Sequence, residues 1–230
     1  MTTFALRAAL LGAALATALC VPASAGVVNF DSHVAWTTGT VSGKPATGTT
    51  VLTNDFTSFA YSSQGITFGR AGLSTGAVVY AGGGAGGTAN GICGLDASGN
   101  VVINCTGDQY FSFVTTDQNH KAAATDHLSF AIGDAGPDLD KWIIHVYDIN
   151  DQELEARILS SVNFTTQSFD YSGINRVWVQ WTGAAGVGGY FLDAFAFNTP
   201  AVPARVPEPA SLALFGLGLA GLLSRRKRRA

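Results

Sequence analysis

The chain has 230 residues, of which 47% are hydrophobic and only 13% are charged, and its formal net charge is −3. Residues 27–199 alone hold six lysines and arginines against fifteen acids, which gives this part a charge of −9. A domain this acidic repels phosphate backbones, which argues against nucleic-acid binding. Thirteen of the fifteen acids are aspartate, which favours turns over helix interiors and indicates a turn-rich β protein.

The first 25 residues have the features of a secretory signal peptide. Arg7 supplies a basic start, residues 8–19 are apolar, and Ala23-Ser24-Ala25 matches the small-residue cleavage site. We therefore expect signal peptidase to remove residues 1–25, so that the mature chain begins at Gly26 outside the cytoplasm.

Two cysteines remain after this cleavage, because Cys20 lies in the signal peptide. In an oxidising compartment Cys93 and Cys105 are expected to form a disulfide. The segment Asp96–Asn100 between them is a strong turn, which predicts that the two sulfurs lie on facing strands. Loop entropy makes such a bridge worth about 3 kcal/mol. A metal site is not expected here, since two cysteines without neighbouring histidines fall short of a ligand set.

Short strand-like runs recur through residues 26–199, separated by Gly, Asn, Asp, Ser and Thr. We expect strands at Val27–Phe30, Thr50–Thr53, Ser58–Tyr61, Gly65–Phe68, Ala77–Tyr80, Val101–Asn104, Tyr110–Val114, His127–Ile132, Trp142–Ile149, Leu154–Leu159, Gln167–Tyr171, Val177–Thr182 and Tyr190–Phe197. No helix is expected between them. About a dozen short strands predict an all-β domain over residues 26–199, a two-sheet β-sandwich that is most simply a jelly roll. Residues 200–205 would form a linker.

Period-two alternation assigns side chains to the two faces of the later strands. In the run 142–149, even-numbered residues such as Trp142 share one face, and odd-numbered residues such as His145 share the other. In the run 177–182, Trp181 shares a face with Val177 and Val179, whereas Trp178 lies opposite.

Two patterns bear on catalysis. Glu153 and Glu155 lie two apart on a predicted strand and hence on one face, where they would not flank a sugar ring as paired glycosidase carboxylates do. Ser74 lies in a G-x-S-x-G pattern, but a strand-like run follows where a nucleophile elbow requires a helix. We therefore expect no enzyme activity, and a secreted hydrolase is the alternative.

Asp31 and Asp193 lie at the two ends of the predicted domain. The segments Asn29–Asp31 and Tyr190–Phe197 resemble the first and last strands of jelly-roll carbohydrate-binding modules, in which an aspartate within an aromatic strand helps hold a structural calcium. The resemblance implies that Asp31 and Asp193 are neighbours and bind calcium. No other cofactor is expected.

The last 25 residues consist of three parts. Val206-Pro207-Glu208-Pro209 is kept extended by its two prolines. Residues 210–223 are apolar and would form a helix of roughly 20 Å, a short span for a hydrocarbon core about 30 Å thick. The basic end resists translocation, so it would stay on the cytoplasmic side of the membrane and halt export of the tail there. It consists of Arg225, Arg226, Lys227, Arg228 and Arg229.

This order of motif, apolar run and basic end in residues 206–230 resembles a PEP-CTERM sorting signal. The resemblance implies an exported protein of a polysaccharide-producing Gram-negative bacterium. It also implies an exosortase as partner, a transient anchor in the inner membrane by a short transmembrane helix, and release to the cell surface or extracellular matrix. It implies nothing about residues 26–200.

The polysaccharide context and the aromatic residues together predict a carbohydrate-binding role for the domain. Aromatic rings can stack on sugars when they are exposed, and Trp36, Trp178, Trp181 and Tyr190 are the candidates. Besides the hydrolase, a purely structural matrix protein remains an alternative.

Overall fold

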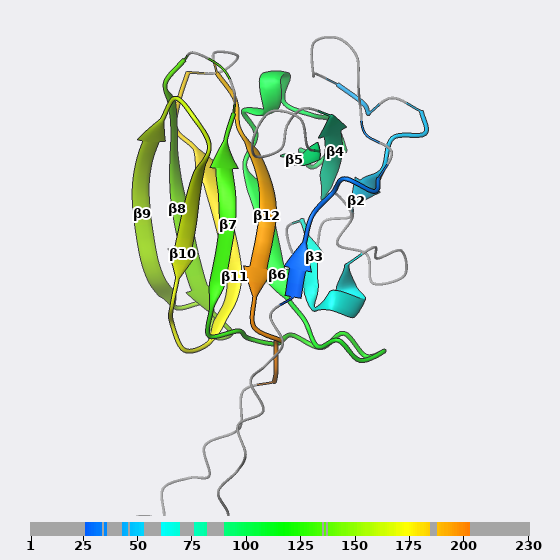
Figure 1. Cartoon of the computed structure of the whole chain (residues 1–230), viewed down its shortest axis with the longest axis vertical. Coiled ribbons are helices and arrows are strands. Elements are labelled where there is room, and N and C mark those ends of the chain that lie inside the picture. The colour runs from blue at the N-terminus through cyan, green and yellow to red at the C-terminus, as the bar shows by residue number, and fades with distance from the viewer. Residues whose placement is uncertain are drawn as a thin grey trace, which may run out of the picture.

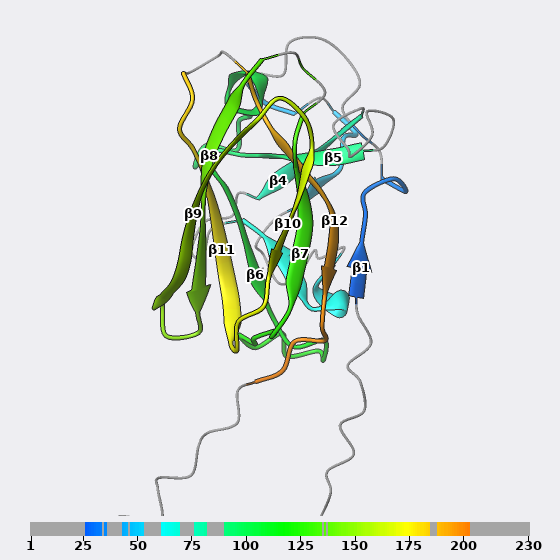
Figure 2. The same cartoon turned by 60° about the vertical axis from the view of Figure 1, so that its left-hand side comes forward.

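The computed structural model describes residues 26–33, 35, 43–45, 47–52, 61–69, 76–81, 90–134, 136, 138–184 and 188–202. These residues form two antiparallel sheets that pack face to face (Figures 1 and 2). The all-β sandwich expected from the sequence is thus confirmed. The signal peptide, the sorting tail, Trp36 and Ser74 lie outside the described residues. Within the described residues, no helix is long and apolar enough to cross a membrane.

The seven-stranded sheet has the order β10-β7-β12-β5-β4-β2, and β1 also pairs with β12. Its strands are β1 (Gly26–Val28), β2 (Val51–Leu52), β4 (Ala77–Ala81), β5 (Asn90–Gly94), β7 (Leu128–Gly133), β10 (Thr165–Phe169) and β12 (Phe191–Phe197). The five-stranded sheet has the order β3-β6-β11-β8-β9. Its strands are β3 (Ile66–Phe68), β6 (Gln109–Phe113), β8 (Asp140–Asp148), β9 (Glu153–Ser161) and β11 (Ile174–Trp181).

The core between the sheets is built largely from phenylalanine rings. Phe195 of β12 meets Phe68 and Phe111 of the other sheet edge to face, with ring centroids 5.4 and 5.0 Å apart. Strands buried on one face supply these rings at every second position, as the burial pattern of β6 shows. The alternation expected in the later strands is confirmed, since Trp142, Val177 and Val179 are fully buried.

One predicted strand is wrong and one strand was missed. Val101–Asn104 forms no strand: only Val101 makes isolated bridges, and the 3-10 helix η2 occupies Ile103–Cys105. Asn104 and Cys105 both have positive φ, which interrupts an extended run. The missed strand is β5, whose two glycines conceal it. Of the predicted strand Ser58–Tyr61, only Tyr61 is described, and it precedes the 3-10 helix η1 (Ser62–Gln64).

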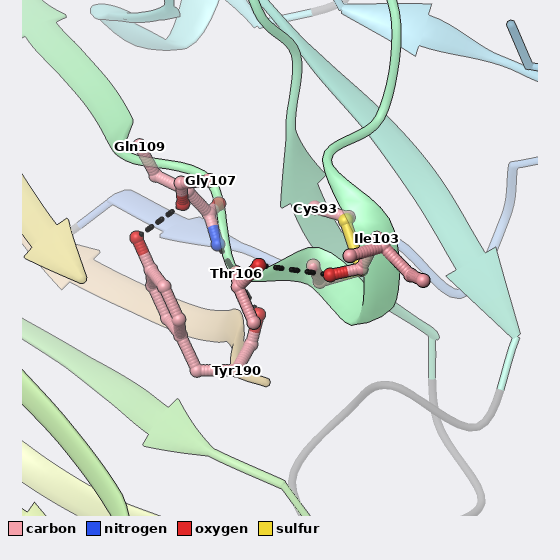
Figure 3. The surroundings of a disulfide bond; sticks show 7 residues. Cys93, Ile103, Thr106, Gly107, Gln109 and Tyr190 are labelled. Carbon is pink, nitrogen blue, oxygen red and sulfur yellow. Dashed lines mark hydrogen bonds between the residues drawn. A yellow bond between two sulfur atoms is a disulfide. The ribbon is translucent and has the colours of Figure 1, made fainter. Parts of the chain in front are cut away.

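The expected disulfide joins Cys93 to Cys105, with Cα atoms 5.4 Å apart. Cys93 lies on β5 but Cys105 ends η2, so the prediction of facing strands is wrong. Figure 3 shows the bridge beside η2, where the Thr106 hydroxyl donates a 2.9 Å hydrogen bond to the Ile103 carbonyl. The expected turn between the cysteines is present, because the Asp96 carboxylate accepts hydrogen bonds from the Ser98 and Asn100 amides.

The first and last described residues leave the sandwich at the same end, which we call the terminal end (Figure 1). At this end Ala201 pairs with Ala124 through two backbone hydrogen bonds of 2.9 and 3.0 Å. Ordered structure therefore continues past residue 199 into the predicted linker. At the opposite end, the β7–β8 and β11–β12 connections cross from one sheet to the other.

Candidate functional site

The outer face of the five-stranded sheet carries several aromatic and polar side chains. They stand in rows because residues paired across neighbouring strands lie side by side. One row contains Tyr110 of β6, Trp178 of β11 and His145 of β8. The next contains Arg176 and Tyr147, and a third contains Gln180 and Ile143. All these side chains are half-buried, whereas their neighbours along each strand face the core.

The first row is a ladder of stacked rings. Tyr110 and Trp178 are 5.9 Å apart between centroids and nearly parallel, at 9°. His145 lies against the other side of Trp178, at 4.6 Å and 18°. Both faces of the Trp178 ring are therefore occupied by its neighbours, and the ladder presents ring edges outward. Tyr147 extends the arrangement, with the Arg176 guanidinium 4.5 Å from its ring centroid.

Hydrogen bonds hold the polar groups of this face in place. His145 interacts through Nδ1 with Glu153 at 2.6 Å and through Nε2 with Gln180 Oε1 at 3.3 Å. The Trp178 indole N–H donates to the Asp108 carboxylate at 3.0 Å. Burial raises the pKa of the Tyr147 hydroxyl, and the nearby Glu153 carboxylate adds to this effect. Tyr147 therefore carries a neutral hydroxyl at physiological pH.

This arrangement is a rigid platform for hydrogen bonding. It offers a carboxylate at Glu153, an amide at Gln180, a guanidinium at Arg176 and a hydroxyl at Tyr147, all on strands. Side chains on strands are held more precisely than side chains on loops. The platform suits a ligand rich in hydroxyl groups that lies across the strands.

Of the three described aromatic residues that were expected to contact a sugar, Trp178 lies on this face, whereas Trp181 and Tyr190 do not. Tyr190 is fully buried, and its hydroxyl donates to the carbonyls of Gly107 and Val179 (Figure 3). Burial accordingly raises its pKa well above the usual value. Trp181 stacks on Tyr190 at 5.8 Å and packs against the core. Tyr110, Tyr147 and His145 were not singled out from the sequence, although the alternation assigned His145 and Tyr147 to the face opposite Trp142.

Glu153 and Glu155 lie on opposite faces of β9, so their expected placement on one face is wrong. A β-bulge explains the difference, since Tyr147 pairs with Glu153 while the preceding Val146 pairs with Glu155. Leu154 is the extra residue. Glu153 therefore joins the outer face, and Glu155 forms an ion pair with Arg157 at 2.7 Å on the other side.

Asp31 and Asp193 both lie near Tyr61. Burial and these two carboxylates raise the pKa of Tyr61 to about 12. Asp31 is exposed and accepts a 2.9 Å hydrogen bond from the Asn90 amide, whereas Asp193 is only 4% exposed. A calcium ion bound between Asp31 and Asp193 stays a prediction.

Residues 205–229 match the family model of the PEP-CTERM protein-sorting motif. The tail expected from the sequence is thereby confirmed. A tail of this class implies an exported protein whose precursor is anchored in the membrane and sorted by an exosortase toward the cell surface. No curated protein sequence matches the chain significantly.

Several solved structures are similar to the chain at low identity. The K2 cleaved adhesin domain of Lys-gingipain has 10% identity and a TM-score of 0.36, covering 65% of this chain and 99% of its own. A family 29 carbohydrate-binding module variant has 14% identity and a TM-score of 0.31, covering 70% and 98%. A family 11 carbohydrate-binding module from Clostridium thermocellum, solved with a mixed-linked tetrasaccharide, has 13% identity and a TM-score of 0.27, covering 77% and 97%. Similarity at this level does not identify a ligand.

Proposed function

We propose that this chain is an exported, non-catalytic surface protein that binds extracellular polysaccharide. In this proposal, signal peptidase removes residues 1–25, and residues 206–230 hold the precursor in the inner membrane until an exosortase processes it. The mature domain then binds glycan on the outer face of the five-stranded sheet.

The observation that carries the glycan proposal is the combination of ring edges and fixed polar groups on that face. Glu153 of β9, Tyr147 of β8 and Arg176 of β11 form one row across three adjacent strands, and Gln180 lies further along β11, so the face provides both acceptors and donors. Sugar hydroxyls are both donors and acceptors, so they match a mixed set of this kind.

The geometry also favours one binding mode over another. Because both faces of Trp178 are covered by Tyr110 and His145, a sugar ring does not stack on it as on an open platform. Binding would instead use hydrogen bonds to Glu153, Gln180 and Tyr147, with the ring edges as an apolar floor. The charge of −9 on residues 27–199 disfavours polyanionic glycans, so a neutral polysaccharide is the expected ligand.

The test is glycan-array binding followed by affinity electrophoresis of the full-length chain in gels that contain neutral polysaccharide. Glu153→Gln and Gln180→Ala should each weaken binding about tenfold, the loss expected for one or two hydrogen bonds. Tyr80→Ala is the matched control. Tyr80 is also a half-buried stacked ring, but it and its partner Phe191 both lie in the seven-stranded sheet, away from the proposed binding face. Its binding should equal that of the unmodified chain.

Three results would contradict the proposal. If the chain binds no glycan, a structural matrix role is favoured. If it releases soluble sugars from a polysaccharide, it is a hydrolase. If Tyr80→Ala weakens binding as much as Gln180→Ala does, the binding surface lies elsewhere.

A further inference from the structure

Three aspartates lie at the end of the sandwich opposite the terminal end (Figure 1). Asp134 and Asp138 belong to the β7–β8 connection, and Asp140 is the first residue of β8. A Cβ atom added at Gly136 would lie 2.6 Å from Asp138 Oδ1 and 2.8 Å from Asp134 Oδ2, so these two carboxylates lie close to the same glycine. The proposed glycan-binding face uses none of the three aspartates.

Asp134 and Asp140 form a buried carboxyl pair, because their side chains are hydrogen-bonded to each other. Asp140 is 0% exposed, and its Oδ2 receives no hydrogen bond from an amide, a hydroxyl or a cationic group. Ionised carboxylates are acceptors only, so a hydrogen bond between two carboxyl groups requires one of them to carry a proton. The pair therefore holds a proton in the folded chain.

Backbone amides fix one oxygen of each partner in the carboxyl pair. Asp134 Oδ1 accepts a 2.8 Å hydrogen bond from the Gly136 amide, within the β7–β8 connection. Asp140 Oδ1 accepts a 3.1 Å hydrogen bond from the Gly189 amide, in the β11–β12 connection. The shared proton thus completes a series of contacts that joins the two connections, and both of these connections cross between the sheets.

The described groups around Asp140 offer the pair no positive charge. Ser161 pairs with Asp140 from β9 and is neutral. From the β11–β12 side, a Cβ atom added at Gly188 would lie 2.5 Å from Asp140 Oδ1, 2.6 Å from Asp138 Oδ2 and 3.2 Å from the Trp181 ring. Lys141, the next residue of β8, is exposed, as expected for the opposite face of the strand. The nearby charge is therefore that of another acid, Asp138.

Burial and the nearby acids favour the protonated form of the pair. Burial, followed by the Asp134 and Asp138 carboxylates, raises the pKa of Asp140 to about 7. Burial also raises the pKa of Asp134, and the Asp138 charge adds to this effect. Both causes penalise a second negative charge in the pair.

We propose that the carboxyl pair is a pH-sensitive fastening, which holds the β7–β8 and β11–β12 connections together while it shares one proton and releases them when that proton is lost. Two buried carboxylates without a proton repel each other and gain free energy by moving into water. Release would loosen this end of the sandwich and leave the sheets paired elsewhere.

The fastening predicts that the stability of the domain falls as the pH rises. In the unfolded chain, aspartate carboxyls titrate near pH 4, whereas the pKa of Asp140 in the folded chain is raised to about 7. Between these values the folded chain binds a proton that the unfolded chain does not, so the folding equilibrium constant should fall by up to about tenfold per pH unit. The contribution is fully present below the unfolded pKa and is lost as the pH passes the folded pKa.

The experiment is urea denaturation of the purified full-length chain at intervals from pH 5 to pH 8. Asp140→Asn and Asp134→Asn should each flatten the pH profile, because the asparagine amide donates the hydrogen bond that the shared proton otherwise supplies. Near pH 5 each variant should be about as stable as the unmodified chain. Near pH 8 each should be more stable, with a folding equilibrium constant at least about tenfold larger.

Two further variants separate the pair from other titrating groups, since histidines also change charge over this range. Asp126→Asn at the terminal end, where Asp126 accepts a hydrogen bond from Asn198, is the matched control and should keep the pH dependence of the unmodified chain. Asp138→Asn should keep it too, but with a midpoint at lower pH, because one like charge is gone.

Hydrogen exchange locates the effect. The protection factor of the Gly189 amide should fall from pH 5 to pH 8 in the unmodified chain and stay constant in Asp140→Asn, because this amide donates to Asp140.

Three results would overturn the proposal. If the unmodified chain and both asparagine variants of the pair have parallel pH profiles, the pair holds no proton. If Asp140→Asn is less stable than the unmodified chain at every pH, the ionised carboxylate is the form that the fold requires. If Asp126→Asn flattens the profile as much as Asp140→Asn does, the titrating group lies elsewhere. No glycan is present in these measurements, so their failure is distinct from failure of the proposed function.

Discussion

The disulfide is the single covalent contact that secures the part of the fold around η2. Cys93 and Cys105 are fully buried with Val78 and Val101 in a small cluster separate from the main core. So small a cluster buries little apolar surface, and the covalent link compensates for this.

Replacing both Cys93 and Cys105 with Ala should therefore lower the free energy of unfolding by about 3 kcal/mol, mainly through the entropy of the unfolded chain. Urea denaturation of the exported protein measures the loss. A reducing agent should weaken the unmodified protein similarly and leave the double variant unchanged. Two free thiols in unreduced protein, detected by alkylation and intact mass, would contradict the pairing.

At the scale of secondary-structure elements, side-chain contacts join β9, the edge strand of the five-stranded sheet, to β10, the edge strand of the seven-stranded sheet. Arg157 of β9 binds both oxygens of Glu155, at 2.7 and 3.0 Å. The same guanidinium donates to Gln167 of β10 and lies 4.1 Å from the ring centroid of Phe169. One planar side chain thus joins the edge strands of the two sheets.

Arg157→Lys should destabilise the domain by about 1–2 kcal/mol, because an ammonium keeps the charge but loses the paired hydrogen bonds and the stacking. Chemical denaturation measures the difference. Lys141→Arg, at an exposed position of β8, is the control and should be neutral. Equal stability of Arg157→Lys and the unmodified chain would mean that Arg157 contributes no more than a surface charge.

The same elements show what a single sequence can and cannot reveal. Runs with alternating burial, such as most of β8 and residues 177–180 of β11, are predictable because burial on one face imposes a period of two. The bulge at Leu154 is not, since it exists only in the register with β8. β5 owes its extended form to pairing with β4 and β12, which no local propensity in Asn90–Gly94 signals. The outer-face platform likewise depends on cross-strand neighbours.

For the whole molecule, the tail decides where the domain is held. Replacing Arg225, Arg226, Lys227, Arg228 and Arg229 with Ser removes charges that cost roughly 2.5–3.5 kcal/mol each at a helix centre and less near its end. The short apolar run should then hold the precursor poorly, and unprocessed protein should leak into the periplasm. Immunoblots of membrane and periplasmic fractions measure this, with the Lys121→Ser variant as control. Undiminished membrane retention would mean that residues 210–223 anchor the chain without the charges.

The position of β12 has a mechanical consequence. This strand is bonded to β7 along one edge and to β5 and β1 along the other, and its chain leaves at the terminal end toward the tail. While the tail still anchors the precursor, tension between its C-terminus and a ligand held on the domain would act along β12. Its hydrogen bonds on both edges would then be loaded together in shear rather than opened one after another. Forced unfolding is governed by the unfolding rate, so this layout favours a domain that keeps its structure under flow.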